Sequence, residues 1–200
     1  MKRVFLALVA TLAAAGAAPA LAEFSLNVPV VSTVSTISGS SFPRGTVAKL
    51  DWNETEGRTA DEPATVTLVS DRRFLYVRFD VTQTAPLIGL AGGDNVAIDL
   101  WPNGDGAAYR FGVGLSGART PDSTANTADW EAAESTHPGG YQVTMKIPLT
   151  AASTNGARVQ LSRWIASTGE LQVWAHSDAE SDVAQAGILT IGSVDAAALR

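Results

Sequence analysis

The sequence predicts an all-β fold, an antiparallel β-sandwich or barrel of about eight or nine strands. Three observations support this. Short runs alternate apolar and polar residues, and turn sequences such as Asn-Gly-Asp-Gly and Pro-Gly-Gly separate these runs. After residue 22, no stretch has the period of an amphipathic helix. Many short strands without intervening helices are typical of sandwiches and barrels. The clearer strands are Ala64 to Ser70, Phe74 to Thr82, Asn95 to Trp101, Ala108 to Leu115, Tyr141 to Pro148, Arg158 to Ala166, Leu171 to Ala175 and Gly187 to Ile191.

Residues 1–22 have the pattern of a secretory signal peptide. Lys2 and Arg3 precede an apolar run that ends at Ala18, and a small-residue cleavage site follows up to Ala22. A membrane anchor needs about 20 apolar residues, and no later stretch is long and apolar enough to span a bilayer. We therefore expect a secreted or periplasmic protein without membrane insertion.

The mature chain is expected to form one domain over residues 46–200, after an irregular lead-in over residues 23–45 with room for an early edge strand. Removing Lys2 and Arg3 from the 14 basic residues leaves 12 against 20 acidic ones, so the mature net charge is −8. This charge disfavours nucleic acid as a partner, because phosphate binding relies on Lys and Arg. The absence of cysteine excludes disulfides, thiolate metal sites and a cysteine nucleophile.

The stretch DNVAIDLWPNGDGAAYRFGVG, residues 94–114, predicts a hairpin with a defined register. With a loop over residues 102–107, the apolar residues of both strands fall on one side and the polar ones on the other. A slip of one residue would put Phe111 in water. The expected opposed pairs are Trp101 with Ala108, Leu100 with Tyr109, Asp99 with Arg110, Ile98 with Phe111, Ala97 with Gly112, Val96 with Val113 and Asn95 with Gly114.

The polar side of this hairpin has two interpretations. Asp99 and Arg110 can form an exposed cross-strand ion pair, worth at most about 1 kcal/mol. Alternatively, the side can be a ligand surface, because Trp101 flanks the pair and Gly112 and Gly114 leave bare backbone beside it. Glycine within a strand often marks the close approach of a ligand or of another backbone.

Four blocks of strand and turn follow one another between about Trp52 and His176. They are Ala64 to Val81 (ATVTLVSDRRFLYVRFDV), Asp94 to Arg119, Asp129 to Leu149 (DWEAAESTHPGGYQVTMKIPL) and Val159 to His176 (VQLSRWIASTGELQVWAH). In order and spacing these blocks resemble the family 9 carbohydrate-binding modules. They are most similar to the family-9-like domains at the start of bacterial secreted and outer-membrane proteins.

The resemblance implies a β-sandwich of jelly-roll type, related to the DOMON superfamily, whose characterised members bind sugars or haem. Family 9 modules hold a terminal sugar between two tryptophan side chains, with arginine, acidic and amide groups on the hydroxyls. The physical basis is that pyranose C–H faces pack on aromatic planes, while planar charged groups bond adjacent hydroxyls. The resemblance therefore implies non-catalytic carbohydrate binding and a carbohydrate ligand.

Alternation ranks the five tryptophans. Trp101, Trp164 and Trp174 fall on the polar sides of their strands and are the first choices for exposed rings, whereas Trp52 and Trp130 are expected to cover the ends of the core. Arg163 falls among apolar neighbours, which predicts either a bulge or an arginine paired inside the protein. The expected carbohydrate-binding residues are Trp101, Arg110, Asp99, Trp164 and Trp174.

No cofactor is expected, and weakly bound Ca²⁺ is the alternative. The loop after Trp101 resembles part of a calcium loop, and Asp105 and Asn103 are its candidate ligands, with Asp99 nearby. Tryptophan occupies the position of the first aspartate, however, and Asn-Gly-Asp-Gly is also favourable turn chemistry. Zinc is disfavoured, because the chain has two histidines and no thiolate.

Three other functions stay open as alternatives. Haem would need Met145 with His137 or His176 as axial ligands, but Met145 alternates with apolar residues like a core side chain. Catalysis has no nucleophile elbow and no carboxylates in apolar surroundings to support it, so we expect no enzyme. The chain can also be an exported structural or adaptor domain with an unknown protein partner.

Overall fold

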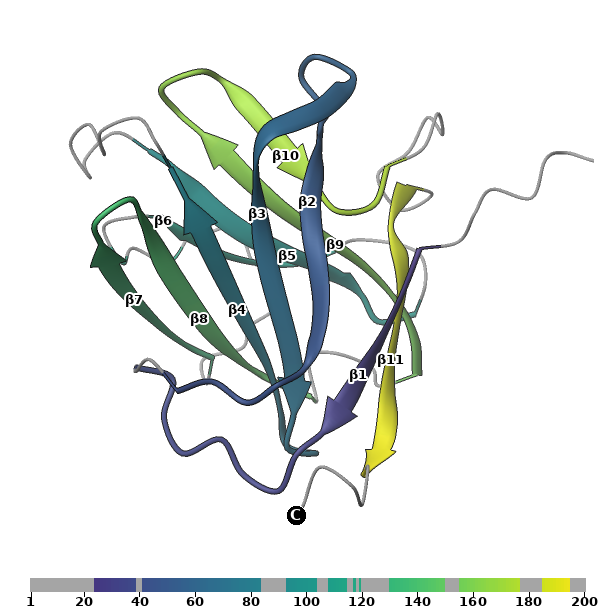
Figure 1. Cartoon of the computed structure of the whole chain (residues 1–200). Helices are drawn as coiled ribbons and strands as arrows, with labels where there is room; N and C mark the ends of the chain where they lie inside the picture. Colours follow the sequence, from purple (N-terminus) through teal and green to yellow (C-terminus); the bar gives the residue numbers. More distant parts are fainter. Residues whose placement is uncertain are drawn as a thin grey trace, which may run out of the picture.

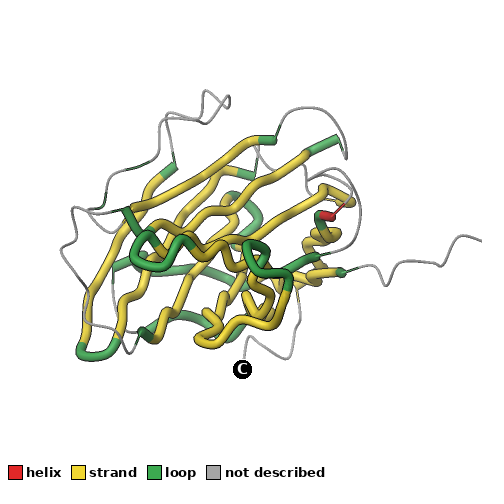
Figure 2. The backbone as a smooth tube through the Cα atoms, turned by 90° about the horizontal axis from the view of Figure 1, so that it is seen from above, coloured by secondary structure: helices red, strands yellow, loops and turns green. Residues whose placement is uncertain are grey.

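The structure is a computed structural model that describes residues 24–38, 41–83, 93–103, 108–114, 117, 119, 130–149, 155–176 and 185–194. It is all-β, as the sequence predicts, and its strands make up most of the described backbone (Figure 2). The strands are β1 Ser25–Val30, β2 Thr46–Asn53, β3 Arg58–Ser70, β4 Phe74–Thr82, β5 Asn95–Trp101, β6 Tyr109–Gly114, β7 Glu131–His137, β8 Gly140–Pro148, β9 Asn155–Ile165, β10 Glu170–Val173 and β11 Gly187–Val194. The predicted signal peptide lies outside the described residues.

The strands form two faces of a sandwich that are joined at one side. Strands β10, β2, β3, β4, β8 and β7 make the sheet nearer the viewer in Figure 1, and β6, β5 and β9 cross behind it. Strand β10 pairs with β9 on one side and with β2 on the other, so the backbone ladder continues from one face to the other. We call the side of each sheet that points away from the sandwich interior its outer face.

Strand β1 corrects the expectation of a purely antiparallel fold. It runs parallel to β11, with Ser25 opposite Ile188, and it meets β3 in parallel at Val30 and Ser70. These pairings close β1, β11, β9, β10, β2 and β3 into a six-stranded barrel. The sheet is therefore mixed, and β1 forms within residues 23–45, which the sequence assigned to an irregular lead-in. The jelly-roll type stays a prediction.

All eight expected strands are present, and β1, β2 and β7 are additional. Leu26, Val28 and Val30 of β1 alternate with more exposed residues, but proline lacks the N–H that a strand ladder uses, so Pro29 disfavours a strand prediction there. Strand β7, with the sequence EAAESTH, is a mostly exposed edge strand that pairs with β8. Because neither side of it is buried, its sequence does not alternate apolar and polar residues. Strands β1 and β7 thus each carry a local feature that disfavours strand prediction.

The register of the β5–β6 hairpin is confirmed from Asn95 opposite Gly114 to Leu100 opposite Tyr109. Its apolar side enters the core between the two sheets, where Phe111 packs edge-on against Trp130 at 5.5 Å. The core position expected for Met145 is also confirmed, because its side chain is fully buried on β8. The expectation that Trp130 packs at the core is likewise met.

Arg163 lies inside the sandwich, which confirms the second of the two alternatives for this residue. Its side chain is 0 % exposed, and its guanidinium lies 5.9 Å from the ring centroid of Tyr141. It donates hydrogen bonds to the Glu62 carbonyl oxygen at 3.3 Å and to the side-chain oxygens of Gln172 and Gln83 at 3.4 Å each. A buried guanidinium is tolerated only where such acceptors surround it.

This pairing reverses the faces predicted for β10. Gln172 is fully buried beside Arg163, whereas Leu171 and Val173 lie on the outer face. Trp174, two residues beyond Gln172, consequently points inward and is 8 % exposed. Its ring packs edge-on against Phe24 at 5.6 Å and lies so close to Gly187 that a Cβ there would be 2.5 Å from it. The expectation of an exposed ring at Trp174 is therefore wrong.

The reversal of β10 can be tested with two adjacent substitutions. We expect Gln172→Leu to lower the free energy of unfolding by about 1–3 kcal/mol, because it removes an acceptor from a buried guanidinium. Leu171→Gln should cost less than about 1 kcal/mol, because that side chain is on the outer face. Urea denaturation of both variants measures the difference. A larger loss for Leu171→Gln than for Gln172→Leu would contradict the inward orientation of Gln172.

Candidate functional site

A cleft with a volume of about 420 Å³ lies over the outer face of β5, β6, β9 and β10. Directly opposed residues of antiparallel strands share a face. The registers therefore place Arg110, Asp99 and Gln160 in one row, and Ser162 and Val173 in a neighbouring row. The cleft is lined by Glu54, Asp99, Trp101, Ala108, Arg110, Gln160, Ser162, Leu171, Val173 and Gln185. Its volume falls within the range of small-molecule sites in proteins.

Asp99 and Arg110 form the cross-strand ion pair that the hairpin register predicts. Arg110 Nη1 lies 3.0 Å from Asp99 Oδ2 and 3.4 Å from Asp99 Oδ1. The Asp99 side chain is 12 % exposed and that of Arg110 is 40 % exposed. A pair this exposed adds about 1 kcal/mol or less to stability. What the pair provides in the cleft is a carboxylate held in one position beside a guanidinium that still faces solvent.

Gln160 forms a rigid part of the cleft lining. Its side-chain oxygen accepts hydrogen bonds from the backbone N–H groups of Leu161 and Ala175 at 3.1 Å each. Its Nε2 donates to the carbonyl oxygen of Ala175 at 2.6 Å. Gln160 therefore holds the chain that follows β10 against β9, and its own amide cannot rotate freely.

The three tryptophans expected to be exposed are placed differently. Trp101 lines the cleft, but its ring is set into the wall and is 6 % exposed, so the expectation of an exposed ring is wrong here too. Trp164 is 38 % exposed as expected, but it does not line the cleft. Trp174 is in the core. The structure thus brings together Asp99, Trp101 and Arg110, and leaves Trp164 and Trp174 apart from them.

Sequence reasoning missed Glu54, which follows β2 directly and lines the cleft, and the placement of Trp52 beside it. The register between β2 and β3 shifts between Leu50 and Trp52, and this bulge places Trp52 opposite Val173, on the face that carries the cleft. Trp52 Nε1 donates to Glu54 Oε2 at 3.0 Å, and Glu54 lines the cleft. Simple alternation would put Trp52 on the core side with Leu50. No local pattern in the sequence predicts this bulge.

An aromatic contact also holds Trp52. Its ring stacks on that of His176, with centroids 4.3 Å apart and planes 6° from parallel. Phe24 completes the group at 5.4 Å from His176. Trp52 is therefore half-buried beside the cleft rather than at the end of the core, where the sequence placed it.

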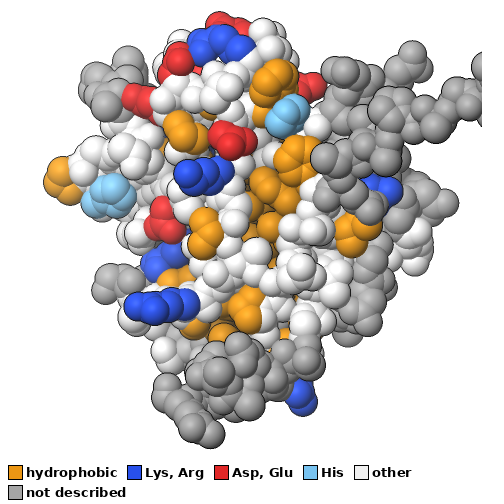
Figure 3. Space-filling model, turned by 45° about the vertical axis from the view of Figure 1, so that its right-hand side comes forward, with side chains coloured by type: hydrophobic (Ala, Val, Ile, Leu, Met, Phe, Trp, Pro, Cys, Tyr) orange, Lys and Arg blue, Asp and Glu red, His pale blue; other side chains and the backbone are white. Residues whose placement is uncertain are grey.

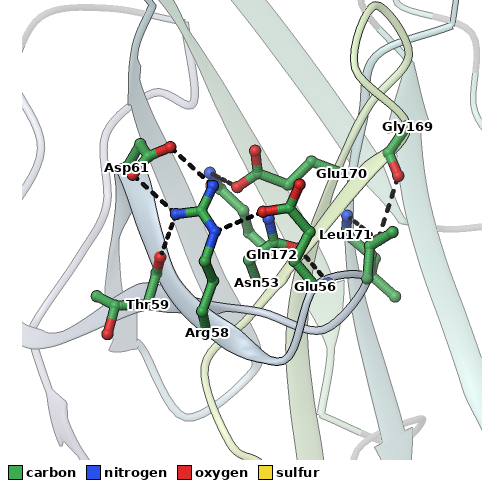
Figure 4. A network of polar contacts seen from close by, with 10 residues as sticks. Asn53, Glu56, Arg58, Thr59, Asp61, Gly169, Glu170, Leu171 and Gln172 are labelled. Carbon is green, nitrogen blue, oxygen red and sulfur yellow. Dashed lines mark hydrogen bonds and ion pairs between the residues drawn. The ribbon is translucent and has the colours of Figure 1, made fainter.

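The turns after β2 and β9 are joined by a network of polar contacts (Figure 4). The N–H of Glu54 donates to the Leu171 carbonyl at 2.8 Å, and the N–H of Leu171 donates to Thr55 Oγ1 at 3.0 Å. At the start of β3, Arg58 donates to both carboxylate oxygens of Asp61 at 2.8 and 2.9 Å. These bonds fix Glu54 relative to Leu171, and both residues line the cleft.

Weak calcium binding by Asp105 and Asn103 stays a prediction. Asn103 is exposed, and Asp105 lies outside the described residues. Within the described part of the chain, no group of three or more His, Cys, Asp or Glu side chains is arranged to hold a metal ion. No helix among the described residues is long and apolar enough to cross a membrane.

The placement of the indoles predicts how a neutral quencher acts on tryptophan fluorescence. Collisional quenching by acrylamide requires access to the ring, so Trp164→Phe should lower the initial Stern–Volmer slope. Trp174→Phe should not lower it, because that ring is buried. A larger drop for Trp174→Phe than for Trp164→Phe would contradict the placement of both rings.

The chain matches no protein-family model and no curated protein. The solved structures that are similar to it include two of a carbohydrate binding module family 9 (CBM9) from Caldicellulosiruptor kristjanssonii, one in complex with glucose and one in complex with cellotriose. The glucose complex has a TM-score of 0.59 and 18% sequence identity, and the match covers 86% of this chain and 98% of that one. The cellotriose complex has a TM-score of 0.56 and 19% identity, with coverages of 86% and 97%. The chain therefore has a fold like that of family 9 carbohydrate-binding modules.

Proposed function

We propose that this protein is a non-catalytic carbohydrate-binding domain that holds a sugar in the cleft beside Asp99 and Arg110. The observation that carries the proposal is the convergence of this ion pair and Trp101 in one cleft. Support comes from the fold, because the similar structures are carbohydrate-binding modules in complex with glucose and cellotriose.

The chemistry of the cleft walls suits a pyranose ring. Arg110 offers planar donors and Asp99 offers acceptors, and paired groups of this kind bond neighbouring hydroxyls. The hydroxyl of Ser162 adds a further donor and acceptor. Leu171 and Val173 supply apolar surface for the C–H face of the ring. A sugar needs both kinds of wall, because its hydroxyls lie at the ring edge and its C–H groups lie on the ring faces.

The polar groups are also held in place before any ligand arrives. Asp99 is nearly buried and bonded to Arg110, and Gln160 is bonded to the backbone on both of its side-chain polar atoms. Binding therefore loses little side-chain entropy, which leaves more of the interaction energy for affinity.

Trp164 and Trp174 have different roles in this proposal, because one ring is exposed and the other is buried. Trp164 has an accessible ring outside the cleft, so it can contribute to a longer ligand or to another contact surface. The buried ring of Trp174 supports the site only through packing. Export to a secreted or periplasmic location, the relation to the DOMON superfamily and the absence of a cofactor are further parts of the proposal.

An adaptor domain that binds another protein is the second candidate. The exposed ring of Trp164 favours it, because aromatic side chains are enriched where proteins contact one another. In that case the ring of Trp164 would be covered by the partner, and the cleft would take no sugar.

Arg110→Ala tests the sugar proposal. We expect this change to weaken binding of glucose and cellotriose about 10- to 100-fold, because a charged hydrogen-bond donor contributes about 1.5–3 kcal/mol. Arg73→Ala removes the same charge from the turn between β3 and β4 and serves as the matched control, with affinity within about twofold of wild type. Calorimetric titration gives the affinities.

Thermal melting shows whether both variants are folded. The melting temperature should change little in each, because the ion pair of Arg110 adds little stability. Equal affinity of Arg110→Ala and wild type would place the sugar elsewhere. If wild type binds no sugar on a glycan array, the adaptor function stands instead.

A further inference from the structure

The outer face of the sheet nearer the viewer in Figure 1 carries a second hollow, which shares no lining residue with the cleft. Figure 3 views this side obliquely and shows charged side chains of both signs among small hydrophobic patches. The hollow has a volume of about 520 Å³ and lies over β2, β3, β4 and β8. We call it the groove, and its lining includes Phe42, Arg44, Val47, Thr67, Asp80 and Gln142.

One wall of the groove is the segment from Phe42 to Gly45, which leads into β2. Gly45 lies so close to β3 that a Cβ on it would be 2.2 Å from the Leu68 carbonyl oxygen. Only glycine permits this approach, so the segment lies directly against the sheet. At its other end, the ring of Phe42 stacks on the Arg78 guanidinium, 5.1 Å from the ring centroid. The wall is thus anchored at both ends.

The floor carries a chain of polar groups on neighbouring strands. Arg78 Nη2 donates to Gln142 Oε1 at 3.1 Å, and the Gln142 side chain is hydrogen-bonded to Asp80 in turn. Burial raises the pKa of the Asp80 carboxyl, while Arg78, Gln142 and His137 lower it. The arrangement presents Asp80 as a fixed acceptor, and the neighbouring Thr67 hydroxyl is the next group on β3.

Apolar surface and a second cation complete the groove. Val47 is 57 % exposed and, with Trp164, is one of the two exposed large hydrophobic side chains among the described residues. Arg44 is exposed at the rim and has no hydrogen-bond or ion-pair partner in the described part of the chain. With Arg78, it gives the lining two cationic groups against the single carboxylate of Asp80. The groove is therefore locally cationic on a chain whose formal net charge is −6.

From this combination we infer that the groove is a second binding site, for an acidic sugar that carries a carboxylate beside its hydroxyls. Arg44 binds the carboxylate, since a guanidinium matches a carboxylate with two parallel hydrogen bonds. Asp80 and Thr67 bond the hydroxyls, and Val47 contacts the C–H face of the ring. A neutral sugar would leave Arg44 unused, whereas a simple carboxylate would leave Asp80 and Thr67 unused. The groove site does not depend on the sugar proposed for the cleft.

Glucuronate and glucose form the matched pair of probes, because they differ only in the carboxylate at C6. Amide chemical shifts of the ¹⁵N-labelled full chain are followed during titration with each sugar. We expect glucuronate to give saturable shifts at Val47, Thr67 and Gln142. Glucose should give none at those amides, whatever it does at the cleft. An oligomeric uronate as a third probe separates binding of a chain from binding of the free sugar, since only a chain that spans the groove gains affinity over the monomer.

Two substitutions identify the group that binds the carboxylate. Arg44→Ala should weaken glucuronate binding at the groove about tenfold or more. Lys49→Ala removes one positive charge from the same face without touching the groove lining, and should change the affinity by less than about twofold. Both side chains are exposed, so neither variant is expected to unfold.

Arg110→Ala distinguishes this proposal from that of the cleft. It should leave the glucuronate shifts at the groove unchanged even where it abolishes sugar binding at the cleft. The inference is overturned if glucuronate shifts only cleft residues such as Ser162, if it gives no saturable shift, or if Arg44→Ala and Lys49→Ala bind it equally.

Discussion

The burial of Arg163 is the constraint on which the site depends most. A guanidinium inside a sandwich must be surrounded by acceptors, and the Gln172 side chain is one of those that Arg163 finds. Once Gln172 points inward, the period of two along β10 sends Leu171 and Val173 outward, and Trp174 follows directly after the strand with its ring in the core. One buried charge therefore decides which side chains of β10 line the cleft.

The position of β10 extends this effect to both sheets. The strand is only four residues long, yet it pairs with β9 and with β2. Glu54, just after β2, is thereby brought to the cleft built by β5, β6 and β9, and Trp52 lies beside it. Gln160 holds the chain after β10 against β9, so the junction is fixed from both directions. The cleft lies where the two sheets meet, and it needs residues from both.

The sequence was sufficient where a strand has one buried and one polar side. The β5–β6 register was predicted pair by pair, because only one register sorts all its apolar residues to the core. That register also placed Asp99 opposite Arg110, which is the centre of the candidate site. Strand β7 escaped prediction for the opposite reason, since an exposed edge strand has no apolar side.

The remaining errors come from features that no local pattern encodes. The faces of β10 were reversed because a buried arginine outweighed the apolar character of Leu171 and Val173. Trp52 was misplaced because a bulge shifts the register after Leu50. The groove was not predicted because its residues come from four strands and the segment that leads into β2. It forms only where Phe42 packs on Arg78. In each case the deciding contact joins residues that are distant in the sequence.

The parallel pairing of β1 with β11 has a consequence for how the chain reaches this structure. Ser25 and Ile188 are neighbours in the ladder although about 160 residues separate them along the chain. The barrel can close only after β11 has been synthesised, so partial chains lack the strand that pairs with β1 and β9 and keep an open edge there. Proteins whose contacts join residues distant in sequence fold slowly, in about milliseconds to seconds. A nascent chain of this protein therefore stays incompletely folded, and open to capture by chaperones, until β11 has been made.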